Sequence, residues 1–366
     1  MTTQLPMIVQ NKMEQHHFER LTPIQEKCFE TIKNGEDIVA VSPTGTGKTL
    51  AYILPFLDKL EKNETLQLLV LAPSQELAQQ IGSVCREWLD VTVQVITGGA
   101  NVKRQIEQLK KKPEVIVGTP GRLHELMSQT KKIKCHQLKS IVLDEADYLL
   151  KEEHLHTVRD IVKRAPSQRQ LLFFSATSND TLEHISKWFN TQANFINVAH
   201  QTSNVTHGFI RVEERKRSDI LRKLAYVNKM RGLVFVQNVG SLALLYEKMM
   251  FENIKVGVLH SDTHHIERKK MLDAFKEGNV TFLLTTDVAS RGLDITDLPY
   301  VIQYDLPREK DIYLHRAGRT GRMGKSGCVI SFVSTKQEIE YKKIVPKNTD
   351  IKEYIVKDSI LQEKHK

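Results

Sequence analysis

The sequence predicts an α/β protein of two tandem domains, each a mostly parallel sheet with helices on both faces. Three observations carry this prediction. Short apolar runs alternate with stretches of helical periodicity along the chain, a glycine-rich loop at residues 42–49 joins an expected strand to an expected helix, and residues 190–208 turn polar and lose helical periodicity. A chain of 366 residues is long enough for about two domains, each with its own core.

Composition is that of an ordinary globular protein, with 40% hydrophobic and 27% charged residues. No apolar run approaches the roughly 20 residues that a membrane span needs, and residues 1–15 lack a signal-peptide profile, so we expect a cytoplasmic protein. Four scattered cysteines, Cys28, Cys85, Cys135 and Cys328, show no metal-ligand spacing and predict free thiols. The net charge of +9 fits a polyanionic partner such as nucleic acid, although many basic proteins bind none.

The first expected helix covers residues 25–34. Thr22 and Pro23 are a common N-cap and N1 pair, so helix capping alone accounts for them. Capping leaves Phe18 and Gln25 unexplained.

Residues 42–49 follow an expected strand at 37–41 and precede a helical stripe at 50–60. Gly45 and Gly47 allow a tight turn that brings backbone N–H groups against a phosphate, Lys48 can neutralise β- and γ-phosphate oxygens, and the Thr49 hydroxyl can meet Mg²⁺. The usual pattern opens with glycine where this chain has Ser42. The alternative is a glycine-rich turn with a chance lysine. Even as a phosphate loop the segment indicates only a nucleotide, because kinases, GTPases, transporters and helicases share it.

The alternation then continues to the end of the first domain. Expected strands and helices lie at residues 67–72, 74–88, 91–97, 101–110, 114–118, 120–128, 140–143 and 170–174.

Polar residues follow the last two of these strands. Asp144, Glu145 and Asp147 come after one strand, and Ser175 and Thr177 end the next. The carboxyl ends of parallel strands meet at one edge of a sheet, where α/β proteins bind ligands. Asp144 would then hold Mg²⁺ and Glu145 would orient or deprotonate the water that attacks the γ-phosphate. The alternative is a solvated helix start, where carboxylates suit the helix dipole.

We place the first domain at residues 1–199, a linker at 200–206 and the second domain at 207–366. The second half repeats the alternation without another phosphate loop, at residues 232–236, 241–251, 255–259, 265–276, 280–285, 300–304 and 328–333.

Two polar stretches stand out in the second domain, at residues 286–294 and 315–322. Arg316, Arg319 and Arg322 fall within seven residues and are separated by glycines. A guanidinium binds phosphate oxygens in pairs, which predicts a phosphate-facing role; the alternative is a solvated basic turn. The tail at 342–366 has mixed charge and no repeat typical of an RNA-binding appendage.

Together these stretches resemble the DEAD-box family of ATP-dependent RNA helicases over nearly the whole chain, with the motifs in the family's order. Residues 144–147 spell Asp-Glu-Ala-Asp. The resemblance implies two RecA-like domains that use ATP and Mg²⁺, with RNA as partner. It implies that Phe18 stacks on adenine, that Gln25 bonds the adenine edge and that Asp294 contacts ribose. The nucleotide loop would comprise Ser42, Thr44, Gly45, Thr46, Gly47, Lys48 and Thr49; the family's own loop begins with a small residue other than glycine, which accounts for Ser42.

The remaining roles also come from the resemblance. Ser175 and Thr177 would bond Asp147 and couple the ATP state to the RNA state, while Arg319 and Arg322 would be arginine fingers at the γ-phosphate when the domains close. Contacts to RNA backbone would come from Pro73, Gln75, Gly99, Thr119, Arg122, Arg268 and Thr286.

Four departures from the family pattern bear on RNA affinity more than on ATP chemistry. Gln75 stands where arginine is usual, His265 where glutamine is usual and Ser261 where glycine is usual. An aromatic residue expected well upstream of Phe18 has no counterpart.

The leading hypothesis is an RNA-stimulated ATPase that melts short duplexes locally. Alternatives are an ATP-gated RNA clamp that does not unwind, and a small-molecule kinase or generic P-loop ATPase. Ribosomal or RNA-decay proteins are expected partners, no membrane partner is expected, and a monomer is the default.

Overall fold

The computed structural model of the chain describes residues 5–130, 132–177, 180–198, 205–260, 263, 265–290, 298–321, 325–346 and 349–364. The chain divides into two compact units, residues 1–200 and 201–366. Strand β8 (Val205–Arg211) begins inside the expected linker, because Val205 and Thr206 pair with Gly327 and Cys328 of the neighbouring strand. Residues 205 and 206 are therefore strand and not linker.

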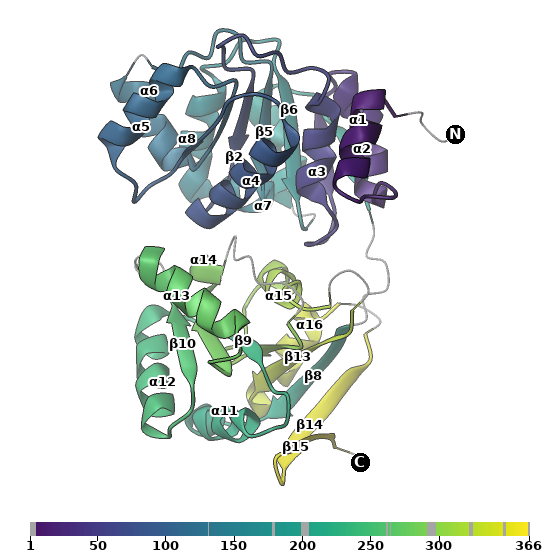
Figure 1. Cartoon of the computed structure of the whole chain (residues 1–366). Helices are drawn as coiled ribbons and strands as arrows, with labels where there is room; N and C mark the ends of the chain where they lie inside the picture. Colours follow the sequence, from purple (N-terminus) through teal and green to yellow (C-terminus); the bar gives the residue numbers. More distant parts are fainter. Residues whose placement is uncertain are drawn as a thin grey trace. The chain divides into compact units, whose positions relative to one another are not determined.

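The sheet of the first unit has the strand order β3-β4-β2-β5-β6-β1-β7, and all its recorded pairings are parallel (Figure 1). Its strands are β1 (Ile38–Val41), β2 (Leu68–Leu71), β3 (Val93–Ile96), β4 (Val115–Gly118), β5 (Ser140–Asp144), β6 (Gln170–Ser175) and β7 (Asn194–Asn197). The helices are α1 (Met7–Gln15), α2 (Pro23–Lys33), α3 (Lys48–Ile53), α4 (Gln75–Trp88), α5 (Val102–Gln108), α6 (Pro120–Gln129), α7 (Ala146–Leu149), α8 (Glu152–Val162), α9 (Asp180–Glu183) and α10 (Ile185–Phe189).

Side chains that alternate along the strands form two separate cores, one on each face of this sheet. In β2, Leu68 and Val70 pack with helices α2, α3 and α4, whereas Leu69 and Leu71 pack with α6 and α8. Because both faces are covered, the central strands read as continuous apolar runs. The predicted α/β fold of the first domain is confirmed.

The second unit repeats this architecture, with the strand order β10-β11-β9-β12-β13-β8-β14-β15. Its further strands are β9 (Gly232–Phe235), β10 (Val256–Leu259), β11 (Phe282–Thr285), β12 (Tyr300–Gln303), β13 (Gly327–Val333), β14 (Ile351–Lys357) and β15 (Ile360–Glu363). Its helices are α11 (Arg217–Ala225), α12 (Val239–Phe251), α13 (His265–Lys276), α14 (Asp287–Ser290), α15 (Lys310–Ala317) and α16 (Glu338–Ile344). Leu233 and Phe235 of β9 pack with α13, α15 and α16, and Val234 packs on the other face with α11 and α12.

The end of the chain forms a β-hairpin that the sequence analysis did not predict. Residues Ile351–Glu353 of β14 pair in parallel with β8, and Tyr354–Lys357 pair only with β15, antiparallel. Figure 1 shows this hairpin in yellow, projecting beyond the sheet.

No helix in the described part of the chain is long and apolar enough to span a bilayer.

Candidate functional site

Apart from Phe18 and Gln25, which precede the first strand, the predicted site residues of the first unit follow the carboxyl ends of strands of one sheet. Strands β2, β5, β6 and β1 are adjacent and parallel, with Val41 opposite Ser175 and Asp144 opposite Phe174. The loops after these strands therefore meet at one edge, as the sequence predicted.

The glycine-rich loop has the backbone that its glycines predict. Gly45 and Gly47 have φ of 82° and 90°, a left-handed conformation that favours glycine. A Cβ on Gly47 would lie 2.5 Å from Nε2 of Gln25, so space as well as conformation requires glycine there.

Side chains within the loop hold it in one shape. The hydroxyl of Ser42, which replaces the usual glycine, donates to Oγ1 of Thr46 at 2.8 Å, and Thr46 donates to the carbonyl of Pro43 at 2.8 Å. The ammonium of Lys48 donates to the carbonyl of Ser42 at 2.7 Å and to that of Ser175 at 3.4 Å. Ser42 thus has a structural role in the loop.

Gln25 ties helix α2 to the same loop. Its Oε1 accepts from the backbone N–H of Thr22 at 2.9 Å, and its Nε2 donates to the carbonyl of Gly47 at 3.1 Å. The first of these bonds completes a capping box with Thr22, so the expectation that capping leaves Gln25 unexplained was wrong. An N-cap threonine with glutamine three residues later was the signal that sequence reasoning missed.

Phe18 lies close to Trp88. It is 41% exposed, and its ring meets the Trp88 indole edge to face at a centroid distance of 5.6 Å. His16 stacks on the same indole at 4.3 Å. An exposed aromatic ring with a rigid support is suited to stacking on a planar ligand.

Asp144 is buried at the end of β5 and is held by two donors. The hydroxyl of Tyr52 donates to Oδ2 at 3.0 Å, and the N–H of Glu145 donates to Oδ1 at 2.9 Å. Burial raises the pKa of the Asp144 carboxyl to about 6, and the nearby Lys48 ammonium opposes that rise. A carboxylate with this pKa is mostly ionised at neutral pH and can bind a cation.

Glu145 has a left-handed backbone, with φ of 52° at the start of α7. This conformation costs a non-glycine residue about 1 kcal/mol, and such outliers cluster at functional sites. Its Oε2 is buried without a hydrogen-bond partner among the described residues. A polar group of that kind suits a water molecule.

Hydrogen bonds join the ends of β5 and β6 through Asp147. Its Oδ2 accepts from the hydroxyl of Thr177 at 3.1 Å. Ser175 donates to the carbonyl of Thr177 at 2.7 Å and accepts from its N–H at 3.2 Å, which fixes the turn that presents Thr177. The predicted coupling residues thus lie together.

The predicted first-unit RNA contacts follow strands β2, β3 and β4, and the segments after β2 and β4 both touch the segment after β3. Gln75, two residues after Pro73, lies against Gly99, where an added Cβ would be 3.1 Å from Oε1 of Gln75. Arg122, three residues after Thr119, donates to the carbonyl of Ala100 at 3.0 Å and pairs with Glu125 at 2.9 Å. The side chains of Gln75 and Arg122 and the backbone of Gly99 therefore lie in one patch at the edge of the sheet.

Among the predicted residues of the second unit, those whose side chains the structure describes are buried. Thr286 follows the carboxyl end of β11, and Arg268, Arg319 and Thr286 are each at most 7% exposed. The guanidinium of Arg268 donates to the carbonyl of Ala289. Ser261, Asp294 and Arg322 lie outside the described residues, as does the side chain of His265.

Arg316 is structural, which corrects the expectation that all three neighbouring arginines face phosphate. Its side chain is 4% exposed, and its guanidinium makes two bonds to Asp287, at 2.6 and 2.9 Å. It also donates to the carbonyl of Asp305 at 2.7 Å and lies over the ring of Phe235. A buried arginine needs such partners, and the bonds between Arg316 and Asp287 hold α15 to α14.

Sequence reasoning missed Tyr52 as well as the role of Arg316. Tyr52 counted only as part of an apolar stripe, yet it lies one helical turn after Thr49 and its hydroxyl needs a partner when buried. That spacing was the available signal.

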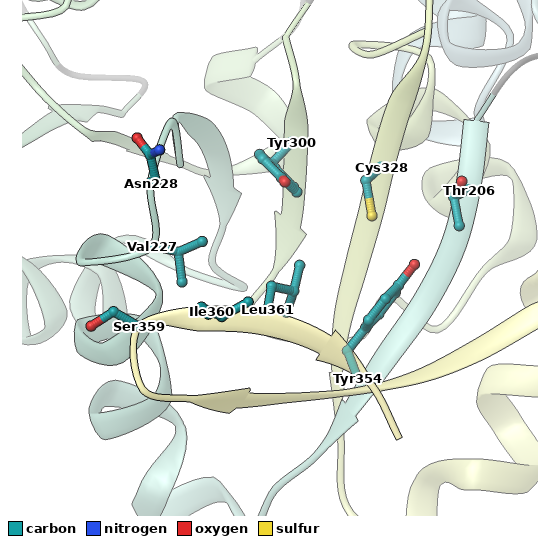
Figure 2. A pocket seen from close by; sticks show the side chains of 9 residues that line it. All are labelled: Thr206, Val227, Asn228, Tyr300, Cys328, Tyr354, Ser359, Ile360 and Leu361. Carbon is teal, nitrogen blue, oxygen red and sulfur yellow. The ribbon is translucent and has the colours of Figure 1, made fainter. Parts of the chain in front are cut away.

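A pocket of about 390 Å³ lies elsewhere in the second unit, beside the β14–β15 hairpin (Figure 2). Thr206, Tyr300 and Cys328 line it from the amino ends of β8, β12 and β13. Thr286 lies at the opposite edge of the sheet, so the pocket is separate from the predicted site.

Family models of known proteins match segments of both units of the chain. Residues 22–185 match the family described as DEAD/DEAH box helicase, and residues 215–324 match the helicase conserved C-terminal domain. The chain is 42% identical to the probable ATP-dependent RNA helicase YfmL of Bacillus subtilis, over 93% of this chain and 92% of that protein. It is 40% identical to the DEAD-box ATP-dependent RNA helicase CshC of Bacillus cereus, over 90% and 86%. Among solved structures, Saccharomyces cerevisiae Dbp5 bound to RNA and ADP BeF₃ is 30% identical, with a TM-score of 0.85 over 95% of this chain and 93% of that one.

Proposed function

The chain belongs to the DEAD-box family of ATP-dependent RNA helicases, and from this premise we propose which of its residues bind ATP and RNA and how they act. The observation that carries the proposal is the meeting of Lys48, Asp144, Glu145 and the Thr177–Asp147 bond at one edge of the first sheet.

ATP binds at the glycine-rich loop. Backbone N–H groups of the loop and the Lys48 ammonium take the phosphates, which requires Lys48 to exchange its carbonyl partners for phosphate oxygens. Phe18 stacks on the base. The Gln25 amide uses one site on Oε1 and one on Nε2 within the protein, so one acceptor and one donor site are left to read the edge of adenine.

The Thr49 hydroxyl and the Asp144 carboxylate would hold Mg²⁺. Both are oxygen ligands of the kind that Mg²⁺ prefers, and Mg²⁺ usually keeps several waters beside one or two protein ligands. When bound, it would neutralise charge on the β- and γ-phosphate oxygens.

Glu145 orients the attacking water through its buried Oε2. Arg319 and Arg322 are the proposed arginine fingers and Asp294 the proposed ribose contact, so hydrolysis should need residues from both units. An arginine finger is worth about 10³ to 10⁵ in rate.

RNA binds along its backbone without sequence reading. The solved structure of Dbp5 named above holds RNA, which supports RNA as the partner of this chain. The proposed contacts are Pro73, Gln75, Gly99, Thr119, Arg122, Arg268 and Thr286. The result is local unwinding or remodelling of RNA, in ribosome assembly or mRNA turnover. Association with ribosomal or RNA-decay proteins and a cytoplasmic location stay predictions.

Substitution Glu145→Gln tests the ATP site. It removes the charge that orients water while keeping shape, so turnover should fall at least a hundredfold and ATP affinity should stay within about threefold of wild type. The measurements are steady-state phosphate release and equilibrium binding of a fluorescent ATP analogue. Glu152→Gln, an exposed acid in the first turn of α8, is the matched control and should leave both unchanged.

Wild-type turnover in Glu145→Gln would refute the assignment of Glu145. A strand-displacement assay on a short duplex with a single-stranded flank separates unwinding from an ATP-gated clamp, because a clamp binds the RNA and displaces no strand.

A further inference from the structure

Tyr52 is fully buried and is bonded to Asp144, a proposed magnesium ligand. It falls in α3, three residues after Thr49, so the two side chains lie on the same side of the helix about one turn apart. A tyrosine hydroxyl at a buried position must find a polar partner, and Tyr52 finds Asp144.

The partner of the Tyr52 hydroxyl is one of the two proposed magnesium ligands. It donates to Oδ2 of Asp144 at 3.0 Å. Because an ionised carboxylate can only accept, the hydrogen of this bond comes from Tyr52.

The bond from Tyr52 leaves acceptor sites of Asp144 available for a cation. An ionised carboxylate has about four lone-pair sites. Those of Asp144 take one hydrogen from Tyr52 and one from the N–H of Glu145, so others remain for a metal-bound water.

Packing fixes the ring of Tyr52. It meets Phe174 edge to face, at a centroid distance of 5.1 Å and an angle of 62°. Phe174 lies on β6 directly opposite Asp144 on β5. The sheet that positions Asp144 therefore also positions the ring that donates to it.

We propose that Tyr52 is a positioning residue that holds Asp144 by a hydrogen bond and presets this carboxylate for Mg²⁺. The proposal rests on the assignment of Thr49 and Asp144 as magnesium ligands in the proposed function. Removing the hydroxyl should weaken Mg²⁺ binding and leave the phosphate loop intact, because the Ser42–Thr46 bond and the Lys48 bonds to the carbonyls of Ser42 and Ser175 do not involve the Tyr52 hydroxyl.

The variant Tyr52→Phe removes one oxygen atom and keeps the ring. Binding of a fluorescent ATP analogue to the full chain is measured over a series of Mg²⁺ concentrations and in EDTA. The Mg²⁺ concentration that gives half of the metal-dependent gain in affinity should rise roughly tenfold, the scale of a lost hydrogen bond to a charged group. Affinity in EDTA should equal that of wild type.

Tyr341→Phe is the matched control. Tyr341 is 1% exposed in the second unit, and its hydroxyl donates to the carbonyl of Gly208 at 3.0 Å. This variant also loses a buried hydroxyl bond, yet its Mg²⁺ dependence should match wild type.

Two results would overturn the proposal: a wild-type Mg²⁺ dependence in Tyr52→Phe, or an equal loss of affinity with Mg²⁺ and in EDTA, which would make the hydroxyl part of the general packing. If the ATP affinity of the wild-type protein does not depend on Mg²⁺, the assignment of Thr49 and Asp144 as magnesium ligands is refuted. This outcome can be distinguished from failure of the Tyr52 proposal because it is seen before any substitution is made.

Discussion

Removing the carboxylate of Asp287 should destabilise the second unit and leave the first unchanged. Asp287→Ala deletes both bonds to Arg316, at 2.6 and 2.9 Å, and leaves the guanidinium of a side chain that is only 4% exposed without its counter-ion. Breaking a buried pair from one side costs about 3 to 5 kcal/mol. Asp287 itself is 28% exposed and Arg316 keeps the carbonyl of Asp305, so we expect the lower end, about 3 kcal/mol.

The two tryptophans allow the effect to be localised. Trp88 and Trp188 both belong to the first unit, so their fluorescence follows that unit, while circular dichroism follows both. In urea unfolding of the full chain, Asp287→Ala should move a dichroism transition to lower urea and leave the fluorescence transition in place. For a unit of this size the thermal midpoint should fall by about 6 to 12 °C.

An exposed ion pair in the same unit provides the control. Arg211 and Glu338 approach to 2.7 Å, with Arg211 44% exposed, so Glu338→Gln should cost less than about 1 kcal/mol. If Asp287→Ala unfolds at the wild-type urea concentration, Arg316 is solvated in solution and the structural assignment is refuted.

Two further predictions concern the first unit. Because the Asp144 carboxyl titrates near pH 6 when folded and near its ordinary 3.8 when unfolded, its ionisation costs the folded state up to about 3 kcal/mol as pH rises between these values. Without ATP, Asp144→Asn should therefore gain stability relative to wild type from pH 4.5 to 7 in urea unfolding followed by tryptophan fluorescence; parallel pH profiles would contradict the raised pKa. Gln75→Arg adds a cation to the patch formed with Gly99 and should tighten RNA binding several-fold, with a slope of log affinity against log salt steeper by about 0.7. An unchanged salt slope in fluorescence anisotropy would place Gln75 away from the RNA.

The layout of both sheets could be predicted because it depends on local patterns. Continuous apolar runs marked the central strands, such as Leu68–Leu71, and glycines marked the loop at residues 42–49. Asp144 and Glu145 were found because polar residues directly after a buried strand are easy to recognise in a sequence.

Features that depend on a distant partner could not be predicted in this way. Arg316 looked phosphate-facing because its partner Asp287 is 29 positions away in the chain. Tyr52 finds Asp144 at a separation of 92 positions. Strand β14 was missed because β8, its partner in the sheet, comes at the start of the second unit in the sequence, whereas β14 comes near its end. The outer half of β14 pairs only within the hairpin.

The most direct test of the account is the rate of ATP hydrolysis by the full chain as RNA is added. Wild type should hydrolyse ATP slowly alone and faster with increasing RNA until a plateau, and Glu145→Gln should stay near zero throughout. A wild-type rate that does not change over a wide range of RNA concentration would contradict the proposal that ATP hydrolysis and RNA binding are coupled in this protein.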